Sequence, residues 1–143
     1  MLRVVMASKE FGLIADFLER NKDNTINDEF VLRVCAGRHY YELFHIVKDW
    51  LSNHYLSQYN AAGGATHAAL QNCCHILQDT ENEDLFEKLE LKLRALHDLR
   101  VNADYHLDRD FSNGKLVTMK VEKERLYLLL DSLFAKLIQQ KQA

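Results

Sequence analysis

The stretch that decides the fold is LFEKLELKLRALHDLRVNADYHL, which runs from Leu85 to Leu107. Its apolar residues recur at every third or fourth position, a spacing typical of a helix that packs one face against a core. The repeating residues are Leu85, Leu89, Leu93, Leu96, Ala103 and Leu107. The stripe would be continuous if position 100 were apolar, but that residue is Arg100. The sequence therefore predicts a core-facing helix with one charged side chain on its buried side.

Further helical patterns lie on both sides of this stretch. The segment from Asn27 to about Asn53 is apolar on most sides, which predicts a helix at the centre of a bundle or in an interface. Gly37 within it would permit a close helix crossing. Thr80 and Glu83 match a capping box before the Leu85 helix. Additional helices are expected over residues 8–20, 66–77 and 118–139, separated by turns or loops at 21–25, 57–65 and 111–114.

Composition independently favours an all-α fold. The 143 residues include five glycines and no proline, while 48% are hydrophobic and 27% are charged. Proline makes up about 5% of average usage and is common in the turns of β-rich folds, so its absence favours helices. We expect a single domain over residues 1–143, folded as an antiparallel bundle of four or five helices.

The sequence also indicates the compartment of the protein and the kinds of ligand that it could bind. No run of about 18 apolar residues is present and the N-terminal apolar stretch is too short for a signal peptide, so we expect neither a membrane span nor export. Cys35, Cys73 and Cys74 form an odd set without CxxC spacing, which favours buried thiols in a reduced, cytoplasmic compartment. Because neighbouring cysteines on a helix point about 100° apart, we expect no metal site, and no cofactor. The net charge of −3 disfavours broad nucleic-acid binding.

Arg100 has two structural explanations and one chemical explanation. It could pair with Asp104, four residues later, or extend its charge to an edge of the bundle. The chemical explanation involves His106 and Asn102 near the same helix end, with His97 on the face of Arg100. Histidine exchanges protons near neutral pH, and arginine holds a phosphate through two parallel hydrogen bonds. These residue types suit phosphodiester chemistry without a metal.

A resemblance to HEPN domains is carried by three segments. Residues 100–106, RVNADYH, resemble the R-x(4–6)-H motif of that superfamily in the form R-x-x-A-D-Y. Residues 37–45, GRHYYELFH, are similar to its R-x-Y-Y-x-x-F-H helix. Thr66 and His67, followed by an apolar helix, are similar to its S-H-G segment. The order and spacing of the three segments extend the resemblance over roughly residues 30–134.

The resemblance implies an all-α homodimer in which the two motifs meet across a two-fold axis to form one cleft. It also implies metal-independent RNA cleavage, often by the toxin of a toxin–antitoxin pair whose antitoxin is a small nucleotidyltransferase of the MNT type. In that case Arg100 would hold the scissile phosphate, and His106 would act on the 2′-hydroxyl or the leaving oxygen. Asn102 would be an accessory polar residue.

Other residues would support this site if the resemblance extends to function. Asp104, Tyr105 and His97 would support substrate binding or the catalytic residues. Arg38 or Tyr41 could line the cleft of the dimer.

Two other functions fit the same residues. In a non-catalytic HEPN module, Arg100, Asp104 and His106 would form a structural network at a dimer or partner interface, and the acidic residues around the motif favour this alternative. In the third, the chain is a helical substrate-binding subunit for a separate nucleotidyltransferase. Retention of His106 and Asn102 favours the nuclease, because a purely structural motif does not need them.

Overall fold

The computed structural model describes residues 2–143, which are 82% helical overall and contain no strand. The all-α prediction is therefore confirmed. Within this range the chain forms six helices: α1 (Leu2–Arg20), α2 (Asp28–His54), α3 (Leu56–Ala61), α4 (Thr66–Leu77), α5 (Glu83–Tyr105) and α6 (Asn113–Gln142). No helix in the described range has the length and apolarity needed to cross a membrane.

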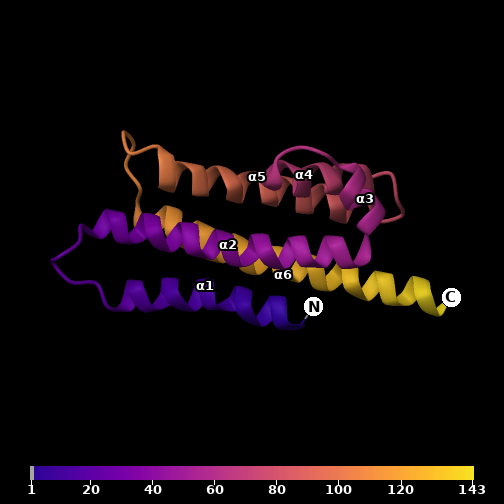
Figure 1. Cartoon of the computed structure of the whole chain (residues 1–143), viewed down its shortest axis with the longest axis horizontal. Helices are drawn as coiled ribbons and strands as arrows, with labels where there is room; N and C mark the ends of the chain where they lie inside the picture. The colour runs from indigo at the N-terminus through magenta and orange to yellow at the C-terminus, as the bar shows by residue number, and fades with distance from the viewer. Residues whose placement is uncertain (1) are drawn as a thin grey trace.

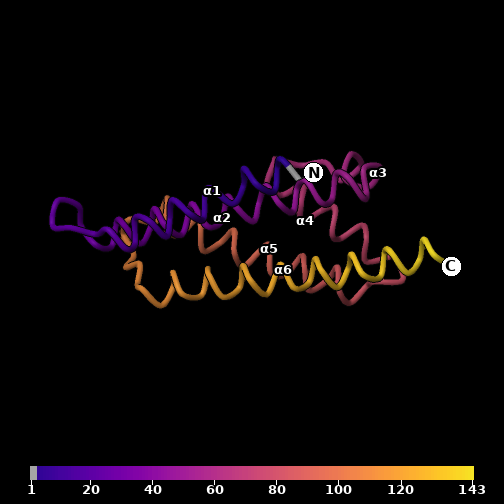
Figure 2. The backbone as a smooth tube through the Cα atoms, turned by 90° about the horizontal axis from the view of Figure 1, so that it is seen from below, coloured from indigo at the N-terminus to yellow at the C-terminus, as the bar shows by residue number. Residues whose placement is uncertain are grey.

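The four long helices form an elongated bundle (Figure 1). Successive long helices run in opposite directions, so α2 and α6 point one way while α1 and α5 point the other. The α2 helix packs against α1, α5 and α6. Short helices α3 and α4 lie at one end of the bundle, and the α1–α2 and α5–α6 connections lie at the other (Figure 1). In the view of Figure 2, α1 and α2 lie on one level and α6 on another.

The central position of α2 confirms the prediction made from its all-round apolar pattern. Its buried positions include Tyr40, Leu43, Val47 and Leu51, which join α4, α5 and α6 in the main hydrophobic core. A smaller core lies between α1, the first half of α2 and the start of α6. Burying these apolar surfaces is the main favourable term in folding, at roughly 25 cal/mol per Å².

The three cysteines are buried free thiols, as predicted. Burial raises the pKa of Cys35 and of Cys73 to about 11, and it raises the pKa of Cys74 as well. The thiols are therefore protonated near neutral pH and act as small apolar side chains.

Three helix starts differ from the prediction, and the first is that of α1, which begins at Leu2 rather than at residue 8. The capping box at Thr80 does not form, because the Thr80 hydroxyl donates to the Leu77 carbonyl and the N-cap residue Asn82 makes no side-chain cap bond. The α6 helix begins at Asn113 rather than near 118, because the Ser112 hydroxyl accepts a hydrogen bond from the Lys115 amide and caps the helix there. A loop was expected over 57–65, but its first part is the short helix α3.

Several apolar residues of α1 are exposed, although an amphipathic helix in a closed bundle would bury them. Leu13, Ile14 and Phe17 are at least half exposed. The helix packs on α2 through another face, where Ala15 is fully buried and its carbonyl accepts a hydrogen bond from the Cys35 thiol. Apolar side chains of α1 are thus left on the surface.

Candidate functional site

Arg100 is buried on the core side of α5, as the interrupted apolar stripe predicted. Its Nη2 donates a 2.9 Å hydrogen bond to the Tyr41 hydroxyl of α2. Its Nε lies 2.9 Å from a carboxylate oxygen of Asp104, an ionic contact whose geometry is not that of a hydrogen bond. The pairing with Asp104 that the sequence left open is therefore present, and Tyr41 provides a second partner from another helix.

Gly37 allows Asp104 to lie close to α2. A Cβ built at residue 37 would lie 3.3 Å from Oδ1 of Asp104, which is tighter than ordinary van der Waals contact. Glycine at this position lets the carboxylate approach the α2 backbone while it pairs with Arg100. The close neighbour of Gly37 is therefore a side chain of α5, and the close helix crossing expected there stays a prediction.

A second guanidinium contacts the same tyrosine ring. The Cζ of Arg38 lies 5.0 Å from the ring centroid of Tyr41 and 5.5 Å from that of Phe11. The Cζ of Arg100 lies 5.3 Å from the centroid of Tyr41 and 5.3 Å from that of Tyr105. Cation–π contacts of this kind contribute about 0.5–1 kcal/mol at exposed sites and fix the orientation of the cation. Two positive charges are therefore held at one aromatic ring.

Two half-buried histidines adjoin this group. The rings of His67, in the first turn of α4, and His97, in α5, have centroids 5.1 Å apart. The Tyr40 hydroxyl lies 3.0 Å from Nδ1 of His67. Burial lowers the pKa of both histidines, and the positive charge of Arg100 lowers it further. Both rings are thus neutral near pH 7 and able to accept a proton.

His45 continues the group toward α1. Its ring stacks on that of Phe11, with centroids 5.5 Å apart and planes 12° from parallel, and burial lowers its pKa. A hollow of about 280 Å³ lies against these two rings and is also lined by Arg3. We call the combined surface the Arg100 face, defined by Arg38, Tyr41, His45, His67, His97 and Arg100.

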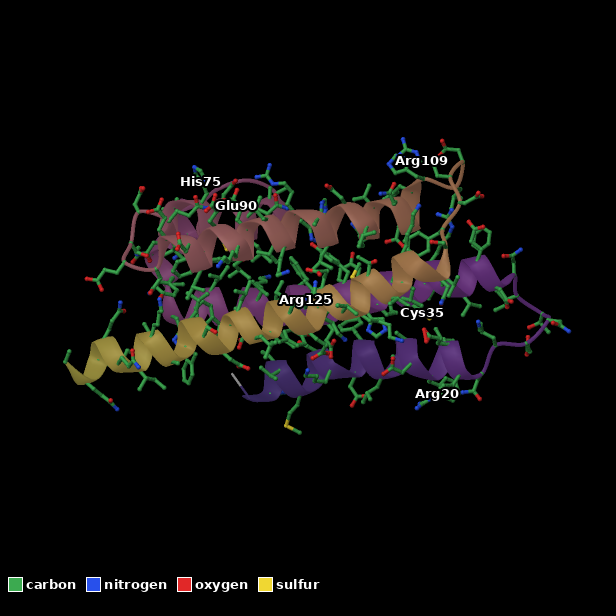
Figure 3. All side chains as sticks on the ribbon, turned by 180° about the vertical axis from the view of Figure 1, so that it is seen from behind. Arg20, Cys35, His75, Glu90, Arg109 and Arg125 are labelled. Atoms are coloured by element: carbon green, nitrogen blue, oxygen red, sulfur yellow. The ribbon has the colours of Figure 1, made fainter. Side chains whose placement is uncertain are left out.

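His106 and Asn102 lie at the end of the bundle. Helix α5 ends at Tyr105, and His106 is its C-cap residue with φ −101° and ψ 67°, so the chain leaves the helix at the predicted catalytic histidine. The amide oxygen of Asn102 accepts a 3.5 Å hydrogen bond from Arg109, which Figure 3 shows in the α5–α6 connection. In residues 2–143, no hydrogen bond or ion pair joins the His106 ring to Arg100 or Asn102. One chain therefore does not bring the three predicted catalytic residues into direct contact.

The supporting residues predicted around Arg100 lie closer to it. Asp104 pairs with its guanidinium and Tyr105 contacts it, although the Tyr105 ring is 67% exposed. His97 lies near enough for the Arg100 charge to lower its pKa. The shared face expected for His97 and Arg100 is confirmed, while the functional roles of all these residues remain predictions.

Arg33 positions the end of α5 and was missed in the sequence. Its side chain is buried, and it donates to four backbone carbonyls, those of Asn102, Ala103, His106 and Arg109. It also pairs with Glu29 at 2.7 Å, and Glu29 in turn accepts a 3.2 Å hydrogen bond from the Phe111 amide. Carbonyls at a helix C-terminus lack partners within the helix, and a cation there satisfies them. The sequence does contain an indication of this role, since Arg33 interrupts an apolar run much as Arg100 does.

A scan of protein-family models, a search of curated proteins and a search of solved structures each found no match for this chain. Within residues 2–143, no group of three or more histidine, cysteine, aspartate or glutamate side chains is arranged to hold a metal ion. The candidate site is therefore defined by its own geometry, as a surface on which guanidinium, imidazole and aromatic groups lie together.

Proposed function

We propose that this protein is a metal-independent endoribonuclease of HEPN type that acts as a homodimer. The observation that carries the proposal is the placement of Arg100, a nearly enclosed guanidinium oriented by Tyr41 and Asp104 beside neutral histidines. A cation fixed before the substrate arrives stabilises the charge that develops on a phosphate without further rearrangement. The remaining N–H groups of Arg100 would donate to the scissile phosphate.

RNA cleavage through the 2′-hydroxyl also needs a base that removes its proton and an acid that protonates the leaving oxygen. In this proposal His106 takes one of these roles, and Asn102 orients the histidine or the substrate. Because His106 makes no direct contact with Arg100 in one chain, the composite cleft would combine residues from two copies. His97 supports the site through its position next to Arg100.

Exposed apolar side chains near the Arg100 face support a dimer there. Val34 is 47% exposed and shares one stripe of α2 with Arg38, Tyr41 and His45, which follow it at helical spacing. Ile14 of α1 is 50% exposed. Apolar surface of this kind is a common feature of sites where proteins associate.

The same surface offers contacts for single-stranded RNA. Bases in unpaired RNA stack on aromatic rings and on guanidinium planes, and both groups meet at Tyr41 and Arg38. We propose that the protein acts in the cytoplasm as the toxin of a toxin–antitoxin or defence system, with a small nucleotidyltransferase of the MNT type as a possible antitoxin. With a net charge of −3 for the chain, recognition would depend on these local contacts more than on long-range attraction.

A non-catalytic interaction module is the second candidate, and one observation favours it. The guanidinium of Arg100 already has Asp104 and Tyr41 as partners, so its burial needs no substrate. In this alternative the Arg100 face would bind a second copy or a nucleotidyltransferase without cutting RNA.

RNA cleavage by the purified protein in the presence of EDTA tests the proposal. We expect Arg100→Ala and His106→Ala each to lower the cleavage rate by about 10²–10³-fold, the effect typical of removing one group that stabilises transition-state charge. Arg94→Ala and His75→Ala are matched controls, because both residues are exposed and both contact Glu90 in the N-terminal half of α5. Figure 3 shows His75 beside Glu90. The controls should cleave at the rate of the unchanged protein.

The products and the oligomeric state separate the two candidate functions. The nuclease should yield fragments ending in a 2′,3′-cyclic phosphate and should leave DNA of the same sequence intact, because the attacking group is the 2′-hydroxyl. Sedimentation should give twice the 16.7 kDa chain mass. Cleavage that persists in either variant would exclude the proposed site, and a clean dimer inactive on varied RNAs would favour the interaction module.

A further inference from the structure

A second hollow lies on the other side of α1 from the Arg100 face. It has a volume of about 320 Å³ and lies between the first half of α1 and the C-terminal halves of α2 and α6. Its walls are mainly apolar and include Ile46, Trp50, Tyr127, Leu130 and Phe134. Pockets for small molecules typically have volumes of about 300–1,000 Å³ and mostly apolar walls with a few polar groups. We call this hollow the Asp49 groove, because Asp49 is one of its polar lining residues.

The polar atoms of the Asp49 groove are unusual because they are buried and unpaired. Oδ2 of Asp49 and Nε2 of His54 are both removed from solvent, and neither has a hydrogen-bond partner in residues 2–143. Both residues line the groove. An unpaired buried polar atom is unfavourable, so nearly all such atoms in folded proteins have partners. A ligand in the groove would supply them.

The Tyr127 hydroxyl is a third buried atom of this kind, but it is less informative. It also lacks a hydrogen bond of good geometry in the described chain. Burial and the nearby Glu42 carboxylate both raise the pKa of Tyr127, so a small rotation would give the hydroxyl a protein partner. The inference therefore depends on Asp49 and His54.

The charged side chains that line the groove favour a cation as its ligand. Asp49 and Asp131 both line it, and the lining cation Lys9 is already engaged with other groups. Its Nζ lies 3.7 Å from a Glu42 oxygen and 4.5 Å from the centroid of the Tyr127 ring. An anionic ligand would meet two carboxylates, whereas an ammonium group would find an unpaired carboxylate oxygen.

The walls of the groove favour an aromatic or otherwise apolar body on that cation. The rings of Trp50 and Phe134 both lie near His54, with centroids 5.2 and 5.8 Å from it. Burial and the Lys141 charge lower the pKa of His54, so the ring is neutral near pH 7 and does not repel a cation. Aromatic faces attract cations, most strongly where water is excluded.

We propose that the Asp49 groove binds a small organic ammonium ion with an apolar body. The ammonium donates to Oδ2 of Asp49, the unpaired Nε2 of His54 takes a second polar contact, and the body fills the space between Trp50 and Phe134. The inference is independent of the proposed nuclease, because the groove shares no residue with the Arg100 face.

Trp50 provides a direct readout of binding, since it is the single tryptophan of the chain and lines the groove. The probes are 2-phenylethylamine, 3-phenylpropionate and 2-phenylethanol, which share a phenyl ring and a short chain but differ in charge. We expect the amine to shift the Trp50 emission saturably and to bind at least about tenfold more tightly than the acid or the alcohol, a difference of about 1.4 kcal/mol.

Two variants test the assignment of Asp49. Asp49→Asn keeps the shape of the side chain and removes its charge, and we expect it to weaken amine binding about tenfold. Asp131→Asn is the control for a general charge effect, because Asp131 is exposed at the groove and should change binding less than twofold. Ile46→Phe fills the groove and should abolish binding. Circular dichroism would confirm that all three variants are folded.

The proposal would be overturned by any of three results. One is tighter or equal binding of the acid or the alcohol. Another is an unchanged amine affinity in folded Asp49→Asn protein. The third is the absence of a saturable change up to about 10 mM amine, which is ten times a millimolar Kd. Loss of RNA cleavage in the Arg100 variants would bear on none of these results.

Discussion

Two of the regions in which charged side chains are buried lie on either side of the contact between α1 and α2, and they differ in how they are closed. The Lys123 network consists of Asp16, His39, Glu42 and Lys123. Lys123 pairs with Glu42 and lies 3.1 Å from Nδ1 of His39. Nε2 of His39 lies 3.6 Å from Asp16. The side chains of Lys123 and Glu42 are only 8% and 4% exposed, so both charges of this pair are enclosed.

The Arg100 face contains a similar ion pair that is partly open. The side chain of Arg100 is 11% exposed, but that of its partner Asp104 is 32% exposed. Water can therefore reach one member of this pair, and the neighbouring His45, His67 and His97 are only half-buried. The comparison shows that buried charge alone does not indicate a site. Both side chains of the Lys123–Glu42 pair are closed to solvent, whereas the Asp104 side chain of the other pair is open to it.

Removing the cation from each pair should give the largest difference between the regions. Lys123→Met leaves the buried Glu42 with only the more distant Lys9, at 3.7 Å, as a cationic partner. It should lower the free energy of unfolding by about 3–5 kcal/mol, as measured by urea denaturation. Arg100→Met should lower it by only about 1–2 kcal/mol, because Asp104 can be hydrated in its place. Equal losses in the two variants would contradict the distinction between an enclosed and an open pair.

Acid should weaken the Lys123 network through His39. Burial, with the Lys123 charge as a second cause, lowers the pKa of His39 to about 4 from an ordinary value of 6.5. Since the unfolded state then binds the proton more tightly, this contribution is complete above pH 6.5 and is lost as pH falls toward 4. The loss is about 3 kcal/mol for a shift of this size.

The difference in stability between the unchanged protein and His39→Gln isolates this effect. Measured between pH 7 and 4, the unchanged protein should lose more stability than the variant. The exposed His75→Gln variant is the control and should follow the unchanged protein. Parallel pH profiles for the unchanged protein and His39→Gln would show that His39 is not held neutral by its surroundings.

Two glycines allow the smallest change in each region, because Gly12 lies against the Glu42 carboxylate of the Lys123 network and Gly37 lies against the Asp104 carboxylate beside Arg100. A Cβ at Gly12 would lie 3.1 Å from the Glu42 carboxylate, and one at Gly37 would lie 3.3 Å from that of Asp104. Glu42 is enclosed and cannot move easily, so Gly12→Ala should cost about 1 kcal/mol of stability without changing cleavage by the folded protein. Gly37→Ala should leave stability nearly unchanged, because better helix propensity offsets the crowding.

The rate of RNA cleavage is the measurement that should distinguish Gly37→Ala from Gly12→Ala. Displacing Asp104 would disturb the orientation of Arg100, so cleavage by Gly37→Ala should fall about three- to tenfold, which corresponds to roughly 1 kcal/mol. We expect substrate binding to change less than the cleavage rate, as for a positioning residue. If cleavage fell in Gly12→Ala and not in Gly37→Ala, the Lys123 network and not the Arg100 face would be the region that supports cleavage.

Much of the fold could be predicted because it depends on local patterns. The α4 helix spans Thr66–Leu77 as predicted, and α2 is central because its pattern is apolar on most sides. Two of the errors in the predicted helix boundaries fall where a single side-chain hydrogen bond decides the boundary. Ser112 starts α6 early, and Thr80 bonds backward to Leu77 instead of capping α5. Such choices depend on small differences between competing local hydrogen bonds.

The site was predictable in part. Arg100 stood out because a charge interrupts an apolar stripe, and Asp104 was within helical reach. The contact between Arg100 and Tyr41 spans 59 residues and depends on the register between α2 and α5, which the sequence pattern does not fix. The meeting of His67 with His97 depends likewise on how α4 packs on α5. The C-cap conformation of His106 could not be predicted, because the spacing of the apolar residues continues to Leu107 and does not indicate that the helix ends at Tyr105.

The hydrogen bonds from Arg33 to the carbonyls at the end of α5, which we call the Arg33 clamp, have a consequence for the order of folding. Three of its carbonyl partners lie 69 to 73 residues further along the chain, so the clamp can close only after most of the chain has been made. Contacts this distant in sequence form late, because the ends of a long loop must first be brought together. The segment that contains His106 therefore takes its final shape near the end of folding, so a nascent chain lacks an organised motif until α2 and α5 have docked.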